Sequence, residues 1–169
     1  MKLDFLKQFI KQTKTDSLKT KDYPKEFLDL KMKVSFGQGA LARVPWVALR
    51  APDMPVSNGY NPVYLFYKKQ GILVLSYGIS ETHIPEKSWE PSIHETKTRI
   101  DEFIDNPARY GDSYVHKYYE PRIEGEEVNF YRDNVKVSEE LIFNELLEIV
   151  NFFKKCLDLR SEEHTSELQ

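Results

Sequence analysis

The segment VYLFYKKQGILVLSY, residues 63–77, decides the fold class of this chain. Two apolar runs, 63–67 and 72–77, are separated by the turn Lys68-Lys69-Gln70-Gly71. Aromatic and β-branched runs on either side of a short turn with glycine predict a β-hairpin. Both runs are apolar on their two faces, so we expect this hairpin to lie at the centre of a sheet that is covered on both sides.

Two shorter runs upstream predict further strands. Residues 31–36 alternate between polar and apolar side chains, which is the period-2 pattern of a half-buried strand. The turn Gly37-Gln38-Gly39 follows, because glycine tolerates positive φ and close backbone approach. Residues 45–49 predict the next strand, and the three prolines in residues 51–62 indicate a loop.

Helical spacing appears in three places. Apolar residues recur every three to four positions over residues 2–14, over residues 93–105 and in a long helix that contains residues 141–153. Ser138 is the expected N-cap of this long helix. We expect residues 25–30 to form one helical turn, whereas 107–131 has no readable period. Few strands, flanking helices and no βαβ alternation predict an α+β fold with a small mixed or antiparallel sheet flanked by helices.

The chain has 169 residues and a mass of 19.9 kDa, which is room for one domain. Residues 1–159 are assigned to it. The last ten residues, RSEEHTSELQ, have no apolar period and look like translated sequencing-adapter read-through. Residues 160–169 are therefore expected to be a non-native or disordered tail.

Several kinds of chemistry have no support in the sequence. The single cysteine, Cys156, excludes an internal disulfide framework and a cysteine-rich zinc site. There is no nucleotide-binding phosphate loop, and the four histidines lack metal-ligand spacing. The acidic run Glu124-Gly125-Glu126-Glu127 fits a metal cluster or a solvated loop. No apolar run reaches the ~20 residues that span a bilayer. We expect a cytoplasmic binding domain without catalysis, cofactor or membrane contact.

The net charge of −3 is unevenly distributed. Residues 1–50 have a net charge of +6, whereas residues 51–159 have a net charge of −7. Only the first third can therefore form a polyanion-binding face, although a solvated basic helix explains the same charge. Aromatic residues make up 13% of the chain, and several lie beside turns. Their rings suit stacking on an unpaired base or packing in an ordinary core.

Seven short motifs occur in one order along the chain: KDYP (21–24), KVSFGQG (33–39), VPW (44–46), SNG (57–59), PV (62–63), YK (67–68) and LVLSYGIS (73–80). Together they resemble the N-terminal DNA-binding domain of McrB, the recognition subunit of modified-cytosine-dependent restriction systems. The match is densest over residues 21–80. It extends to about residue 122 through the segment YGDSY (110–114).

This resemblance implies a reader that flips a methylated cytosine out of duplex DNA into a pocket. Matched position by position, Trp46, Leu65 and Tyr110 fall where the family forms the pocket walls. The rings of Trp46 and Tyr110 would stack on or edge the base, and Leu65 would lie near its 5-substituent. Core packing is the alternative for all three residues.

Two positions differ from the family pattern. The best-known member has an aromatic residue between Gly37 and Gly39, at the position that enters the duplex space left by the flipped base. Gln38 stands there in this chain; it can hydrogen-bond the orphaned guanine but cannot stack as an aromatic ring does. Asn61 replaces a family tyrosine, with Tyr60 adjacent as a candidate substitute.

The expected partner is double-stranded DNA that contains a modified cytosine. In the family, a GTP-hydrolysing ring domain follows in cis and a nuclease subunit acts in trans; neither is recognisable in this chain. The alternatives are a reader of a different modified base and a protein-interaction module that does not bind DNA. Phosphate contacts, with solvated surface as the alternative, are expected from the side chains of Lys21, Lys31, Lys33 and Arg43 and from the backbone of Ser57, Asn58 and Gly59.

Overall fold

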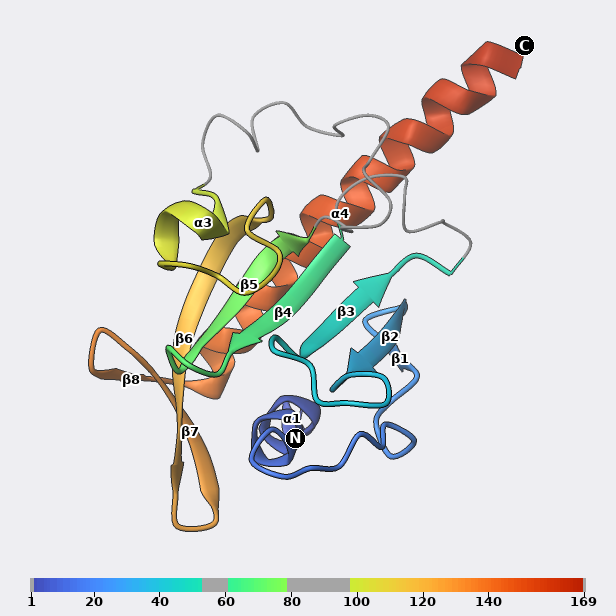
Figure 1. Ribbon diagram of the computed structural model, residues 1–169. Helices are drawn as coiled ribbons and strands as arrows, with labels where there is room; N and C mark the ends of the chain where they lie inside the picture. Colours follow the sequence, from blue (N-terminus) through green and yellow to red (C-terminus); the bar gives the residue numbers. More distant parts are fainter. Residues whose placement is uncertain (1, 53–60, 79–97, 169) are drawn as a thin grey trace.

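The computed structural model describes residues 2–52, 61–78 and 98–168, with side chains up to Cys156. These residues form eight strands and three helices (Figure 1). In chain order they are α1 (Asp4–Gln12), β1 (Glu26–Phe27), β2 (Leu30–Ser35), β3 (Trp46–Arg50), β4 (Asn61–Tyr67), β5 (Ile72–Gly78), α3 (Ile100–Phe103), β6 (Tyr114–Glu124), β7 (Glu127–Arg132), β8 (Val135–Val137) and α4 (Glu139–Leu168).

The eight strands form one antiparallel sheet in which each strand pairs with its neighbour in sequence. Strand β6 is long enough to pair twice. Its residues 114–119 pair with β5, and its residues 120–124 pair with β7. The end of the β6–β7 hairpin therefore extends beyond the other strands as a narrow ribbon (Figure 1).

The predicted hairpin of residues 63–77 is confirmed. Strands β4 and β5 pair over their full length, from Asn61 with Gly78 to Tyr67 with Ile72. They are the fourth and fifth of eight strands, so they lie at the centre of the sheet as expected. Nearly every side chain of both strands is buried, which explains why their sequences are apolar on both faces.

Alternation of side chains divides the core into two layers, one on each face of the sheet. The larger layer lies on what we call the α1/α4 face, where Val47, Tyr64, Phe66 and Leu73 belong to one cluster with buried side chains of both helices. The smaller layer lies on the α3 face. It consists of Val44, Ala48, Val63, Leu65, Tyr67, Val74, Ile100 and Ile104.

The two longer helices, whose presence the periodicity predicts, cover the α1/α4 face. Helix α1 buries Phe5, Leu6, Phe9 and Ile10. The Oγ of Ser138 accepts a hydrogen bond from the Leu141 N–H at 3.1 Å, so the predicted N-cap of α4 is confirmed.

The sequence predicts a sheet of few strands and leaves open whether it is mixed or antiparallel, whereas the observed sheet has eight strands. The structure confirms one domain with helices and strands, but the described residues are mostly sheet, and every strand pair is antiparallel. The difference comes from residues 107–131, whose sequence has no readable period and which contain β6 and most of β7. Their alternation is hard to read because the β6–β7 ribbon leaves both of its faces partly exposed.

Two local predictions were also wrong or too long. The segment 25–30 is not a helical turn, because β1 pairs with β2 across Leu28 and Asp29, which both have positive φ, 54° and 63°. Two consecutive positive φ values are the geometry of a tight hairpin turn. Helix α3 spans only Ile100–Phe103; residues 93–97 of the helix predicted over 93–105 lie outside the described residues.

Candidate nucleic-acid interface

Trp46 and Leu65 are direct cross-strand neighbours on the α3 face. They are Cα partners in the β3–β4 pairing, and Trp46 also pairs with Ser35 of β2. Opposed side chains on one face of an antiparallel pair contact each other. Leu65 is 2% exposed and belongs to the apolar layer itself, whereas Trp46 is only half-buried at its edge.

Tyr110 reaches the same layer from the segment between α3 and β6. It packs, partly buried, against the cluster that contains Leu65. Its φ of 64° is uncommon for a bulky side chain. The Tyr110 carbonyl accepts a hydrogen bond from Ser113 N–H at 3.1 Å, and the neighbouring Gly111 carbonyl accepts one from Asp101 N–H at 3.1 Å. The backbone of this segment is therefore fixed while the ring stays partly accessible.

Two side-chain contacts hold the Tyr110 segment against β4 and α3. The Tyr67 hydroxyl donates a hydrogen bond to the Arg109 carbonyl at 2.9 Å. The Arg99 guanidinium forms ion pairs with Asp101 of α3 and with Asp112, which follows Gly111. The Arg109 guanidinium carbon lies 4.8 Å from the Tyr110 ring centre. The structure thus brings Trp46, Leu65 and Tyr110 to one apolar cluster, although Tyr110 is 45 residues from Leu65 in the sequence.

The turn between β2 and β3 is held in one conformation by Gly37. Its φ is 120°, and a Cβ at this position would lie 2.0 Å from the Ala40 carbonyl oxygen. Ala42 N–H donates to the Phe36 carbonyl at 2.8 Å and closes the loop. Gly39 has a φ of 73° and open space around it. Gln38, at the tip, is exposed.

The same turn presents a residue that sequence reasoning did not select. Leu41 is 46% exposed and is one of few large apolar side chains on the described surface. A hydrophobic side chain on a conformationally fixed loop is the type of group that DNA-bending proteins insert between base steps. Its signal in the sequence was its place in a glycine turn, where an apolar residue has no core to enter.

Basic side chains lie along the α3 face beside Trp46. Lys31 and Lys33 point away from the buried residues of β2, and they pair with Arg50 and Ala48 of β3. Both lysines are exposed, and Arg50 is half-buried. Burial lowers the pKa of the Arg50 guanidinium. Among the described residues no carboxylate forms an ion pair with any of these three cations.

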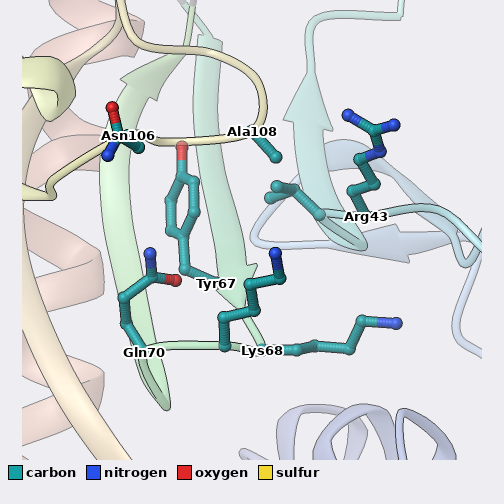
Figure 2. Close-up of a pocket in the computed structure, with 8 residues that line it drawn as sticks. Arg43, Tyr67, Lys68, Gln70, Asn106 and Ala108 are labelled. Carbon is teal, nitrogen blue, oxygen red and sulfur yellow. The ribbon is translucent and has the colours of Figure 1, made fainter.

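A second group of cations lies at the end of the α3 face where the β2–β3 and β4–β5 turns meet. Arg43, Lys68 and Lys69 line a hollow of about 480 Å³ together with Tyr67 and Asn106 (Figure 2). Of these, only Arg43 was predicted as a phosphate contact. The two lysines are visible in the sequence as part of the hairpin turn, but only the fold places them beside Arg43.

The remaining predicted residues are placed differently. Asn61 lies on the α3 face of β4, four residues before Leu65 and half-buried. Lys21 lies in an exposed turn before Tyr23, which belongs to the core on the α1/α4 face. Ser57, Asn58, Gly59 and Tyr60 lie outside the described residues.

Other candidate chemistry in the described residues is limited. No group of three His, Cys, Asp or Glu side chains there is placed to share a metal ion. Within the acidic run at the β6–β7 turn, Glu124 accepts hydrogen bonds from Asn129 and Tyr131 at 2.8 and 2.7 Å. No helix among the residues that the structure describes has the length and apolar composition to cross a bilayer.

Comparison with known proteins identifies the family of this chain. The family model described as "MrcB-like, N-terminal domain" matches residues 2–157. The chain belongs to this family. The MrcB-like match covers all eight strands and confirms the resemblance that the seven motifs indicate.

The chain is also similar to a curated protein of Escherichia coli (strain K12), the "Type IV methyl-directed restriction enzyme EcoKMcrB subunit". The two are 39% identical over 116 residues, which is 68% of this chain and 25% of that relative. The match thus spans about a quarter of the relative's length. The α3 face is therefore part of an MrcB-like N-terminal domain.

Proposed function

We propose that this domain recognises a modified cytosine, 5-methylcytosine in the first instance, in duplex DNA by extruding the base from the helix. It is a binding domain without a catalytic step and would target a restriction system to modified DNA. The observation that supports this proposal most is that Trp46 and Tyr110, both half-buried, pack against one apolar layer that contains Leu65.

The energetics of such a site are favourable. Extruding a base costs a few kcal/mol of stacking and pairing, and an aromatic contact returns about 1–3 kcal/mol per base. We call the base site proposed beside Trp46, Leu65 and Tyr110 the slot; in it, a 5-methyl group would be buried against Leu65. One buried methyl contributes about 0.8 kcal/mol, which corresponds to roughly fourfold discrimination against unmodified cytosine. Larger discrimination would require a difference in the cost of extrusion as well.

The surroundings of the slot suit a duplex. Lys31, Lys33 and Arg50 are cations without a described carboxylate partner on the same face, so they are available for phosphate oxygens. The turn that carries Gln38 and Leu41 would enter the space left by the extruded base. Gln38 would hydrogen-bond the orphaned guanine, and Leu41 would supply the apolar surface that Gln38 lacks.

The larger assembly follows from the family. The similar E. coli protein is named as a subunit of a methyl-directed restriction enzyme. We extend this role to the present chain, with a GTP-hydrolysing ring domain in cis and a nuclease subunit in trans as its partners, in the cytoplasm.

A titration with modified duplexes tests the proposal. Fluorescence anisotropy would be measured with labelled duplexes that contain one 5-methylcytosine, 5-hydroxymethylcytosine or N6-methyladenine, or no modification. We expect the methylcytosine duplex to bind most tightly, and 2-aminopurine placed beside the target to brighten as its neighbour leaves the stack. Trp46→Ala and Tyr110→Ala should each weaken binding about 5- to 150-fold, the equivalent of 1–3 kcal/mol, and remove discrimination.

Tyr131→Ala is the matched control, because this half-buried tyrosine lies on the β6–β7 ribbon away from the slot. It should bind like the unaltered domain. Preference for another modified base would support the first alternative, a different reader. Failure to bind any duplex would favour a protein-interaction module instead.

A further inference from the structure

The hollow at the turn end of the α3 face is formed by three separate segments. Arg43 comes from the β2–β3 turn, Lys68 and Lys69 from the β4–β5 turn, and Asn106 from the loop after α3. Figure 2 shows the Tyr67 ring standing between Gln70 and the segment that contains Asn106 and Ala108. The Tyr67 and Arg109 hydrogen bond fixes this wall to β4. The hollow is therefore a built feature of the fold.

The described lining of the hollow is cationic. It includes Arg43, Lys68 and Lys69, and none of the described residues that line it is Asp or Glu. None of the three takes part in an ion pair with another residue that the structure describes. Lys68 is half-buried, so part of its hydration is already lost. Cations gathered in this way repel one another, and an anion in the hollow would relieve that repulsion.

The shape and chemistry of the hollow do not suit a stacked base. Its aromatic residue, Tyr67, is only 2% exposed, so almost no ring surface is available. Its hydroxyl already donates to the Arg109 carbonyl. The other polar side chains of the lining carry guanidinium, ammonium and amide groups, which are hydrogen-bond donors for phosphate oxygens.

The position of the hollow relates it to the slot. Lys68 follows Leu65 by three residues and lies just past the end of β4, in one direction from the slot. Lys33 and Arg50 lie in the opposite direction, since Lys33 pairs with Ala48, two residues after Trp46. Cations therefore lie on both sides of the slot along the strands. A strand whose base enters the slot must place its backbone on both sides of that base.

From these observations we infer that Arg43, Lys68 and Lys69 form a phosphate site, occupied by the DNA backbone on the turn side of the extruded base. This inference rests on the proposed function. It assigns to Lys68 and Lys69 a general, modification-independent share of DNA affinity. Free nucleoside phosphates carry the same group, so the experiment separates the two sources.

The test uses the double variant Lys68→Gln/Lys69→Gln and the matched control Lys154→Gln/Lys155→Gln. The control pair on α4 also consists of adjacent lysines, the first half-buried and the second exposed, and α4 covers the opposite face of the sheet. Binding to methylated and unmethylated duplexes would be measured across a salt series. Each lost phosphate contact lowers the slope of log K against log salt by about 0.9.

We expect the Lys68→Gln/Lys69→Gln substitution to reduce the magnitude of the slope by about 1.8 on both duplexes. The ratio of the affinities for the two duplexes should stay unchanged, and the control variant should keep the slope of the unaltered domain. An unaltered slope, or an equal loss in the control, would overturn the inference. GTP or inorganic phosphate, added at equal total charge, could also displace the duplex from the unaltered domain. If this competition is lost in the variant, the site binds free phosphates instead. If the slope falls but the two duplexes bind equally, the phosphate site stands and the modified-cytosine proposal fails.

Discussion

The two faces of the sheet come from the same strands and have opposite relations to solvent. On the α1/α4 face, α1 and α4 cover the apolar side chains, and the largest of them are fully buried. On the α3 face the only described helix has four residues, and Trp46 and Tyr110 stay partly exposed among cations. Within the described ranges, the α3 face is less completely covered, which suits a ligand, whereas the burial on the α1/α4 face contributes to stability. The two faces should therefore respond differently to substitution.

The largest effect is expected on the covered face. Phe9→Ala removes a ring that is 0% exposed and lies 5.2 Å, centre to centre, from Phe36. The loss of transfer energy and the cavity left behind should lower the free energy of unfolding by about 3–5 kcal/mol. Urea denaturation followed by circular dichroism measures this. A loss below that of Trp46→Ala would contradict the distinction between the faces.

A smaller loss is expected from the polar group buried on the covered face. Glu145 is 5% exposed; Tyr119 donates to it at 2.7 Å, and Arg132 donates at 3.0 and 3.2 Å. Burial alone would raise the pKa of the Glu145 carboxyl, but the hydrogen bonds from Arg132 and Tyr119 outweigh it and hold this pKa below its usual value. Glu145→Gln should lower the free energy of unfolding by about 1–3 kcal/mol at neutral pH.

The pH dependence of this loss follows from the direction of the shift. Because the folded pKa lies below the unfolded one, the carboxylate stabilises the fold above the unfolded value, about 4.3 for glutamate. That stabilisation falls as the pH drops from there through the folded pKa. The difference between the unaltered domain and Glu145→Gln should therefore shrink in acid. A difference that is constant from pH 7 to pH 3 would be evidence against the charged network.

The smallest effect on stability is expected at the loop of the open face. Leu41→Ser alters a side chain that is 46% exposed, so the free energy of unfolding should change by no more than about 0.5 kcal/mol. DNA binding should weaken nonetheless, because the apolar group proposed to enter the duplex is lost. Anisotropy titration of Leu41→Ser and of Gln38→Ala measures how much each of these two side chains contributes to DNA affinity. Unchanged binding in Leu41→Ser would leave Gln38 as the inserted residue.

Much of the fold follows from local patterns. The hairpin of 63–77, the alternation before Gly37 and the N-cap Ser138 depend on neighbours in sequence, so they could be read directly. The turn at Asp133 and Asn134 also has a local signal, since both residues have positive φ and both types tolerate it. The turn at Leu28 and Asp29 has a weaker one, because leucine rarely adopts such a φ.

The candidate site was predictable only in part. The resemblance selected Trp46, Leu65 and Tyr110, and the fold brings them to one cluster. Lys68 and Lys69 were read as turn residues because their distance from Arg43 in sequence hides their proximity in space. Alternation assigns side chains to one face or the other, but no local pattern states which face a helix will cover.

The sequence by itself determined the hairpin, the helix start and the family, because these depend on short-range periodicity, hydrogen bonds within a turn and ordered motifs. Only the tertiary structure decided that α1 and α4 cover one face while the other keeps Trp46 and Tyr110 partly open. The physical reason is that cover depends on which distant segments pack together, and that packing is set by the burial of the whole apolar surface rather than by any one stretch of chain.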